Sequence, residues 1–297
     1  MREHALGSYK VDWELYTEKI ENLLSAHASK DEIFRVLGSI FKDIDDFHGG
    51  FYYDGTRYGM VQPDVTVRQE LQDGFRIGAK VKSLIVDEMY AYIFIPPVNS
   101  FASDRGISVG QEIDSIICAV SPGVKGWIVD LRLNLGGNMY PMICGLQSIL
   151  GDGKVGSFVT NHETIEWTLS KGTFKAGTDS VTIAGNLCDF KSLPVAVLIS
   201  QLTSSSGEAV AIAFKGRKKT ILIGEPTSGY ISVLNRHQLN SHAMLLLPEA
   251  LMCDRNGDCY TTNVTPDLMS VQGDHLIKLE RDVKVSQAIS WIKERLE

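Results

Sequence analysis

The sequence predicts an α/β fold built on a mostly parallel sheet. Four stretches, "AYIFIPPV", "GWIVDLRLN", "VAVLIS" and "KTILIG", are almost continuously apolar, which is typical of strands that are covered on both faces. Three stretches with helical periodicity lie between them: "SVGQEIDSIICAVS", "NMYPMICGLQSIL" and "GEAVAIAFKGR". This alternation of strands and helices indicates a sheet with helices on both sides.

Two regions depart from this alternation. Residues 11–47 carry apolar side chains at helical spacing and predict two helices, the second capped by Ser29. Residues 51–83 are aromatic and rich in turn residues, and "KVGSFVTNHETIEWTLSKGTF" alternates polar and apolar residues, which favours antiparallel strands. We therefore expect an N-terminal helical domain over residues 1–50 and a core domain over residues 51–297, with β-rich cap segments at about 51–83 and 154–185.

Composition and charge exclude several classes of protein. Hydrophobic residues make up 44% of the chain and charged residues 22%, which is enough apolar material for a large core. The net charge is -7 and no block of Lys or Arg stands out, which argues against a nucleic-acid partner. Apolar runs such as residues 195–199 fall far short of the roughly 18 to 20 residues of a membrane span. The polar start lacks a signal-peptide pattern, so both a cytoplasmic protein and an exported one without its signal fit.

The five cysteines are too scattered for a disulfide scaffold. Cys253 and Cys259 flank an Asn-Gly turn in "CDRNGDC", and a hairpin there would bring them together. A disulfide at this position would imply an oxidising compartment, and the sequence leaves the pairing open. The same segment lacks the Gly and Glu of a calcium loop, so we expect a turn, and we expect no metal or organic cofactor.

The first junction of interest is "WIVDLRLNLGGNMYPM", where a predicted strand runs through residues 134–137 into a helix. Sites in parallel α/β sheets form at the carboxyl ends of strands, and paired glycines let backbone N–H groups approach a ligand. A tight turn without a ligand fits equally well. Asp130 and Arg132 resemble catalytic residues by type, but in a buried strand we expect them to pair structurally.

The second junction is "LISQLTSSSGEAVAIAF", where three serines stand between a strand and a helix. One interpretation is a helix cap with several hydroxyl groups. The other is a nucleophile at a strand-to-helix elbow, beside the N–H groups that a helix leaves unbonded in its first turn. A serine nucleophile needs a base, and of the seven histidines only His48 lies at a glycine-flanked helix exit, where it can point into a cleft.

Taken together, the motifs resemble a known family. "DDFHGG", "WIVDLRLNLGGN", "TSSSGEAVAIAFKGRKKTILIGEPTSG" and "NVTPD" are similar in order and spacing to the tail-specific (C-terminal processing) serine protease family. The resemblance extends from about Trp13 to Asp267. It implies a crotonase-like (ClpP/crotonase) α/β core with a small N-terminal helical domain and a β-rich cap.

The resemblance also implies a set of site residues. The family's nucleophile stands three residues before the Glu of the helix, which makes it Ser205 here. The backbone N–H groups of Ser206 and Gly137 would form the oxyanion hole. Three residues beside this hole would contact the substrate: Gly136, Asn138 and Met139.

The chain departs from the Ser-Lys members of that family in two ways. Tyr230 stands where they carry the lysine base, and no PDZ module fits between the first and second motifs. What remains resembles the lysine-free branch, which includes the tricorn core protease, interphotoreceptor retinoid-binding protein and nisin resistance protein. In the proteases of that branch an N-terminal histidine is the base, and His48 matches it. The branch's third catalytic Glu falls near Tyr260, so we expect a Ser-His dyad, or a triad for which Glu225 is a weak candidate.

The functional expectation is a serine-type peptidase that hydrolyses peptides or the tails of unfolded proteins. The family implies export to a periplasm or cell surface, and the sequence gives no indication of oligomeric state. Two alternatives stay open. One is a binding module of the same fold that holds a peptide or an apolar ligand, and the other is a crotonase-type acyl hydrolase.

Overall fold

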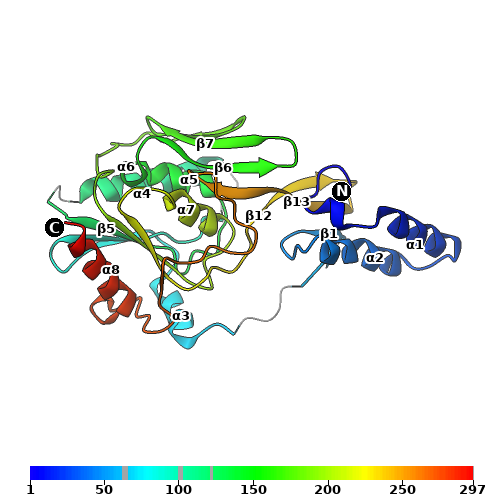
Figure 1. Ribbon diagram of the computed structural model, residues 1–297, viewed down its shortest axis with the longest axis horizontal. Helices are drawn as coiled ribbons and strands as arrows, with labels where there is room; N and C mark the ends of the chain where they lie inside the picture. Colours follow the sequence, from blue (N-terminus) through cyan, green and yellow to red (C-terminus); the bar gives the residue numbers. More distant parts are fainter. Residues whose placement is uncertain (62–65, 100–102, 121–122, 297) are drawn as a thin grey trace. The chain divides into compact units, whose positions relative to one another are not determined.

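The computed structural model describes residues 1–61, 66–99, 103–120 and 123–296, and it confirms a mixed α/β fold (Figure 1). The chain divides into two compact units. The first unit comprises Met1–Val65, Val159–Thr164 and Ser232–Leu251, and the second comprises Thr66–Phe158, Ile165–Ile231 and Met252–Glu297. The boundary at residue 50, between the expected N-terminal helical domain and the core domain, stays a prediction.

The first unit combines two helices with antiparallel strands. Ser29 caps the second helix as expected, since its hydroxyl accepts from the Glu32 N–H while the Glu32 carboxylate accepts from the Ser29 N–H. Strand β1 pairs with β2 on one side and β13 on the other, and β12 also pairs with β13. The elements are a short 3-10 helix Ser8–Lys10, α1 Trp13–Ser25, α2 Lys30–Asp43, β1 Gly50–Tyr53, β2 Thr56–Tyr58, β12 Ser232–Gln238 and β13 Ala243–Asp254, whose last residues enter the second unit.

A six-stranded sheet organises the second unit. Its order is β14-β11-β10-β5-β4-β3, and every ladder is parallel except β3–β4. The four apolar stretches named above form its central strands, which confirms the expected parallel sheet. The strands are β3 Lys82–Val86, β4 Tyr90–Phe94, β5 Gly126–Asp130, β10 Val195–Ile199, β11 Thr220–Gly224 and β14 Leu268–Met269.

Helices cover both faces of this sheet. Figure 1 shows α8 on one side and α4, α5 and α7 on the other. Because successive side chains of a strand point to opposite faces, Tyr92, Ile128 and Leu198 pack in one buried cluster with Val285 and Ile292 of α8. The helices are α3 Gln69–Gly74, α4 Ser103–Ala119, α5 Met139–Gly145, α6 Gln147–Leu150, α7 Ser206–Phe214 and α8 Val283–Glu294, with 3-10 turns at Phe75–Ile77 and Leu279–Arg281.

The expected antiparallel segment is present. Strands β7 and β8 pair antiparallel, and so do β8 and β9. Trp167 and Phe174, on β7 and β8, are fully buried and pack edge to face at 6.5 Å between ring centroids. The strands are β6 Gly153–Thr160, β7 Thr164–Ser170, β8 Thr173–Ala176 and β9 Asp179–Thr182.

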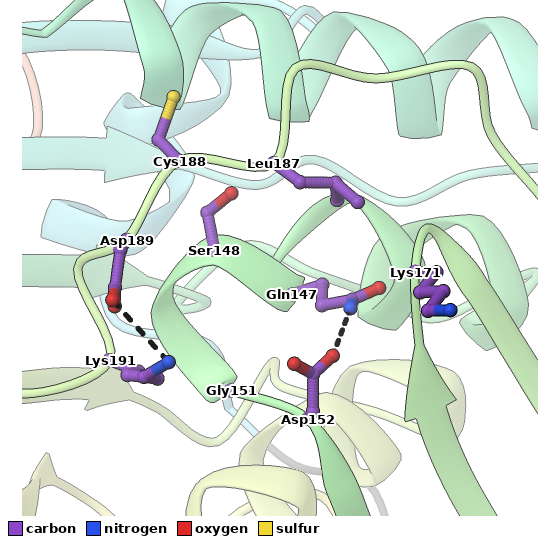
Figure 2. Close-up of a pocket in the computed structure, with 9 residues that line it drawn as sticks. All are labelled: Gln147, Ser148, Gly151, Asp152, Lys171, Leu187, Cys188, Asp189 and Lys191. Carbon is purple, nitrogen blue, oxygen red and sulfur yellow. Dashed lines mark hydrogen bonds and ion pairs between the residues drawn. The ribbon is translucent and has the colours of Figure 1, made fainter.

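Two disulfides cross-link the second unit. Cys253 pairs with Cys259 around the Asn-Gly turn, and Cys118 of α4 pairs with Cys188, a link that no sequence pattern predicts. Cys188 is also part of the wall of a pocket of about 290 Å³ (Figure 2). The pocket is lined by Gln147, Ser148, Gly151, Asp152, Lys171, Leu187, Cys188, Asp189 and Lys191.

Among the described residues, none of the helices combines the length and the apolar character that a membrane crossing requires.

The cysteine pairing leaves Cys144 as a single buried thiol, which gives a direct chemical test. Burial raises the pKa of Cys144 to about 11, so at pH 8 it is protonated and unreactive in the folded chain. We expect iodoacetamide to modify no cysteine of the native protein, one per chain after denaturation, and all five after reduction. Mass spectrometry of non-reduced peptides should find the 118–188 and 253–259 links. Modification of more than one cysteine before reduction would contradict this pairing.

Candidate active site

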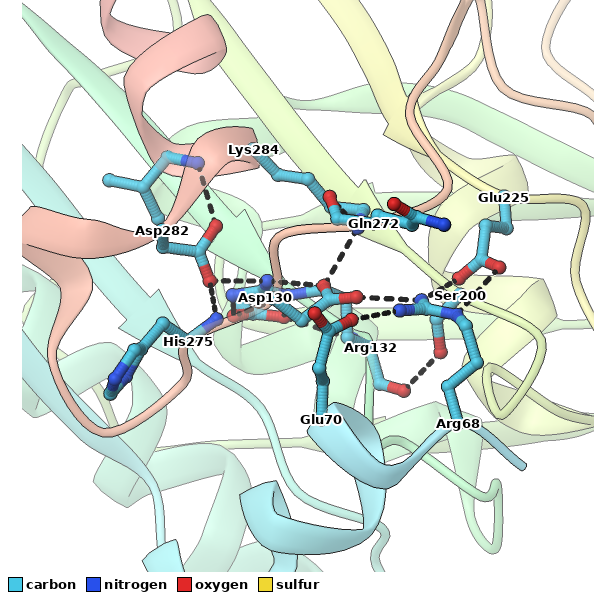
Figure 3. Close-up of polar contacts among 12 residues, drawn as sticks. Arg68, Glu70, Asp130, Arg132, Ser200, Glu225, Gln272, His275, Asp282 and Lys284 are labelled. Carbon is cyan, nitrogen blue, oxygen red and sulfur yellow. Dashed lines mark hydrogen bonds and ion pairs between the residues drawn. The ribbon is translucent and has the colours of Figure 1, made fainter.

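A buried cluster of charges lies at the carboxyl end of β5 (Figure 3). Arg132 is fully buried, and its guanidinium donates to Asp130 at 2.6 Å, to Asp274 at 2.7 Å and to Asp282 at 2.6 Å. The Lys284 ammonium adds a bond of 2.9 Å to Asp274. The expectation that Asp130 and Arg132 pair structurally is therefore confirmed.

The cluster continues to Glu225 through Arg68. The Arg68 guanidinium pairs with the carboxylates of both Glu225 and Asp274. Burial alone would raise the pKa of Asp274, but Arg132, Lys284 and Arg68 outweigh burial and hold the pKa below its usual range. Glu225, the weak candidate for a third catalytic member, thus has a guanidinium partner in this structural cluster.

Asn134 connects the loop that follows β5 to the turn that follows β10. Its side-chain amide donates to the carbonyl groups of Ile95 and Pro96, and its side-chain oxygen accepts from the Gly136 N–H at 3.0 Å. Its backbone carbonyl accepts from the Ser204 N–H at 2.9 Å. The fully buried Asn134 therefore sets the positions of both junctions that the sequence singled out.

Glycines allow these two junctions to touch. A Cβ atom at Gly136 would lie 2.8 Å from the Ser204 carbonyl oxygen, and one at Gly207 would lie 2.5 Å from the Asn134 carbonyl oxygen. A Cβ atom at Gly137 would collide with the Val98 carbonyl group. Gly136 and Gly137 also have φ values of 102° and 106°, which side-chain-bearing residues rarely adopt. Close packing against the second junction thus requires glycine at position 136, and close packing against Val98 requires it at position 137.

Ser205 occupies a high-energy backbone conformation between β10 and α7. Its φ is 49° and its ψ is -116°, outside the regions that residues other than glycine ordinarily populate. Such conformations cost about 1–3 kcal/mol and cluster at active sites. The side chain is half-buried, and a Cβ atom added at Gly136 would lie 3.0 Å from the Ser205 Cβ. Ser205 occupies the N-cap position of α7, but its backbone departs from the extended conformation that is typical of a helix N-cap.

The neighbouring serines have different contacts. The Ser206 hydroxyl donates to the Gly137 carbonyl at 2.6 Å, and Ser204 is buried. The N–H of Ser206 lies in the first turn of α7, where a helix provides no acceptor. At the bridge between Val98 and Gly137, the Val98 N–H donates to the Gly136 carbonyl and the Val98 carbonyl accepts from the Asn138 N–H. Asn138 caps α5 through its side chain, and Met139 is buried at the start of the same helix.

The Glu208 carboxylate holds the elbow at Ser205 in place through hydrogen bonds. Its buried carboxylate accepts from the Ser205 N–H at 2.8 Å, the Thr227 hydroxyl at 2.5 Å and the Gly229 N–H at 2.9 Å. Burial raises the pKa of Glu208 to about 7, although these hydrogen bonds act in the opposite direction. The carboxylate therefore fixes both the elbow and the "EPTSG" loop that precedes Tyr230.

His48 lies in the first unit, on the loop that follows α2. Its Nδ1 is 2.9 Å from the Ser232 carbonyl oxygen and 3.3 Å from the Ser232 hydroxyl. A carbonyl oxygen can only accept, so Nδ1 carries the hydrogen and Nε2 is the basic nitrogen. The Ser232 hydroxyl is also 2.6 Å from Asp46 Oδ1.

The surroundings keep His48 neutral near pH 7. Burial lowers the pKa of His48 below its ordinary value of 6.5, and the Asp46 carboxylate partly opposes this effect. Sequence reasoning does not single out Asp46 or Ser232. Asp46 lies within the quoted "DDFHGG" motif, two residues before His48, and that proximity is a usable signal, whereas Ser232 has no local signal.

The basic residues near the missing lysine have other roles. Lys215 pairs with Asp267 at 2.7 Å, and Lys218 and Lys219 are exposed, as expected. Tyr230 is half-buried at the end of the anchored loop.

Comparison with known proteins assigns the family. The model of peptidase family S41 matches residues 90–270, well over half of the chain. The chain belongs to peptidase family S41. Peptidase family S41 is a family of serine peptidases, and the match confirms the resemblance to tail-specific proteases. The matched residues include both junctions and the "NVTPD" motif.

A curated relative of this chain is the nisin-resistance protein of Lactococcus lactis subsp. lactis. It is 32% identical over 176 residues, which cover 58% of this chain and 51% of that protein. The chain thus spans about half the length of the curated relative that it matches.

Solved structures share the fold over nearly the whole chain. A lipoprotein from Streptococcus agalactiae has a TM-score of 0.69 at 21% identity, covering 99% of this chain and 92% of its own. A candidate peptidase from Parabacteroides merdae has a TM-score of 0.64 at 17% identity, covering 95% and 89%. The mixed α/β architecture is therefore one that these two solved structures share.

The charge cluster predicts a large effect of substitution at Arg132. In Arg132→Met, the carboxylates of Asp130, Asp274 and Asp282 lose their shared cation in a buried site. We expect the free energy of unfolding to fall by about 3–5 kcal/mol, measured by urea denaturation with the fluorescence of buried Trp127 and Trp167. Arg35→Met, which removes the exposed pair with Asp31, serves as the control and should cost less than about 1 kcal/mol. Equal losses in the two variants would contradict a structural role for the cluster.

Proposed function

We propose that this chain is a serine peptidase in which Ser205 is the nucleophile and His48 is the general base. The observation that carries the proposal is the φ of 49° at Ser205, at a strand-to-helix elbow packed against the Gly136-Gly137 loop. Membership of the S41 family supports the same assignment. The neutral His48 with a hydrogen on Nδ1 has the protonation state that a base requires.

The proposed reaction is an acyl transfer in two halves. Ser205 Oγ attacks the peptide carbonyl carbon while His48 Nε2 takes the hydroxyl proton. The tetrahedral intermediate collapses when His48 gives that proton to the leaving amine, which breaks the C–N bond. Water then hydrolyses the acyl-enzyme by the same steps, and no cofactor takes part.

The proposed oxyanion hole consists of two backbone donors. The Ser206 N–H lies at the start of α7, and the Gly137 N–H lies on the loop held by Asn134. Each such donor is typically worth about 3–4 kcal/mol of transition-state stabilisation. Three residues of the β5–α5 connection, Gly136, Asn138 and Met139, would contact the substrate beside this hole.

We further propose that the six-stranded sheet and its helices form a crotonase-like core. The β-rich segments at about 51–83 and 154–185 would frame the cleft and bind an extended peptide by strand addition. Antiparallel strands β7, β8 and β9, which fall within the second of these segments, support this assignment.

The proposed substrates are peptides or the tails of unfolded proteins. The name of the nisin-resistance protein suggests antimicrobial peptides as one class to test. We also propose that the protein works outside the cytoplasm, because two disulfides persist in oxidising compartments.

Cleavage of a mixed peptide library tests the nucleophile and the base. The library contains lanthionine peptides and carboxyl-terminal tails of secreted proteins, and mass spectrometry follows cleavage by the wild type, Ser205→Ala and His48→Ala. We expect cleavage by the wild type that both substitutions reduce by about 100-fold or more. Ser204→Ala is the matched control and should retain cleavage. Undiminished cleavage by His48→Ala would place the base elsewhere, and binding without cleavage would favour a binding module.

The pH dependence of cleavage tests the state of His48. Because burial lowers the pKa of this histidine, its neutral form persists below pH 6.5, and kcat/KM should fall only at more acidic pH. The measurement is kcat/KM from pH 4.5 to 8 on a peptide found in the library, with circular dichroism as a control for folding. An acidic limb centred above pH 6.5, or a flat profile, would contradict the assignment.

A further inference from the structure

A short series of hydrogen bonds connects His48 to a buried carboxylate in the first unit. Asp46 is 8% exposed, and its Oδ2 accepts from the Gly49 N–H at 2.5 Å. Its Oδ1 lies 2.6 Å from the Ser232 hydroxyl, and Ser232 in turn contacts His48 Nδ1 through both of its oxygens. Ser232 is the first residue of β12, separated from His48 by 184 positions, so the fold and not local sequence creates this arrangement.

The direction of each hydrogen bond follows from what each group is able to donate. An ionised carboxylate only accepts, so the Ser232 hydroxyl donates its hydrogen to Asp46. The hydroxyl oxygen then presents a lone pair to His48, as the Ser232 carbonyl oxygen does. Both oxygens of one serine therefore accept from the Nδ1–H of His48, which makes the opposite tautomer unfavourable.

We propose that Asp46 and Ser232 are the positioning residues of His48, with the Ser232 hydroxyl inserted between carboxylate and imidazole. This inference rests on the proposed function, in which His48 takes the proton of Ser205. When Nε2 receives that proton, the imidazole becomes a cation, and the Asp46 carboxylate stabilises it through the oriented hydroxyl. No proton crosses Ser232.

The charged groups around His48 favour this role. The negative group is Asp46, and the positive group is Arg57, whose guanidinium is held by the carbonyl groups of Phe47, Gly49 and Met60. Burial lowers the pKa of His48 and Arg57 adds to this effect, whereas Asp46 and the hydrogen bond to the Ser232 backbone raise it. Of these two charged groups, the carboxylate is the one that favours the imidazolium.

Substitution of Asp46 by asparagine reverses the direction of the hydrogen bonds that connect Asp46, Ser232 and His48. In Asp46→Asn the amide oxygen keeps the bond from the Gly49 N–H, so the amide nitrogen donates to the Ser232 hydroxyl. That hydroxyl then turns its hydrogen toward His48 Nδ1 and competes with the Ser232 carbonyl oxygen, which still favours a hydrogen on Nδ1. The population of the tautomer with its hydrogen on Nε2 therefore rises, and in that tautomer Nε2 cannot take the Ser205 proton. Ser232→Ala removes the connection to the carboxylate but keeps the backbone carbonyl, and Ser232→Thr restores the hydroxyl.

The experiment combines a tautomer measurement with a nucleophile probe. Two-bond ¹H–¹⁵N correlation spectra report the hydrogen-bearing nitrogen of His48, which is assigned by its loss in His48→Ala. A fluorophosphonate probe reports the nucleophile, because Ser205 Oγ forms a bond to phosphorus, fluoride leaves, and His48 takes the hydroxyl proton. The control is Asp54→Asn, which breaks an exposed Asp–His pair of the same unit, at His242.

We expect the wild-type His48 to carry its hydrogen on Nδ1, and Asp46→Asn to raise the fraction that carries it on Nε2. The second-order rate constant of labelling should fall by about 10-fold or more in Asp46→Asn, less in Ser232→Ala, and return toward the wild type in Ser232→Thr. The acidic limb of labelling should move to lower pH in Asp46→Asn, because the carboxylate that favours the imidazolium is gone. Asp54→Asn should match the wild type in labelling and in the His48 signals.

Two results would overturn the inference. One is an Nε2–H tautomer in the wild type, and the other is an Asp46→Asn protein whose His48 signals and pH profile are unchanged, since a purely structural Asp46 would leave both intact. Failure of the probe to label the folded wild type would instead count against the proposed peptidase. In that case the tautomer spectra alone still decide whether Asp46 and Ser232 position His48.

Discussion

The close approach of two backbone segments, residues 134–137 after β5 and residues 204–207 after β10, is the constraint on which the candidate site depends. A Cβ atom at Gly136 or at Gly207 would clash with a backbone carbonyl oxygen of the other segment. The contact is fastened by the bond from the Ser204 N–H to the Asn134 carbonyl and by that from the Ser206 hydroxyl to the Gly137 carbonyl. Two strand ends thereby become a single surface whose donor groups have fixed directions, which is what electrostatic preorganisation requires.

The charge cluster centred on Arg132 helps to hold these two segments in place. Burying so many charges is costly, and an apolar core of the same volume is often as stable or more so. The cluster instead fixes how separate segments of the chain are oriented, because Arg132 donates to three carboxylates, among them those of Asp274 and Asp282. The Ser200 hydroxyl also donates to the Arg132 carbonyl at 2.6 Å, so the start of the elbow is tied to the same residue. The carboxyl ends of β5 and β10 are therefore held in one relative position.

The sequence predicts those features that depend on local pattern. Continuous apolar runs identify β5 and β10, the polar-to-apolar periodicity identifies α2 and its Ser29 cap, and the motif order identifies the family and the elbow serine. Features that depend on distant partners escape it. Arg68 pairs with Glu225 across 157 positions, and Cys118 pairs with Cys188 across 70. Nothing in the immediate sequence of either partner specifies the other. The contact of Ser232 with His48 cannot be predicted for an additional reason. One of the contacting groups is the backbone carbonyl of Ser232, and every residue type has such a group.

The backbone conformation of Ser205 has a consequence for how the protein matures. An isolated segment would relax out of this conformation, because no residue next to Ser205 compensates for its energy. The groups that hold it come from Asn134, Glu208 and the loop at Thr227 and Gly229, which meet only after β5, β10 and β11 have paired. The elbow is therefore among the last features to form during folding. In a newly made chain Ser205 would therefore keep an ordinary backbone conformation until the sheet is complete.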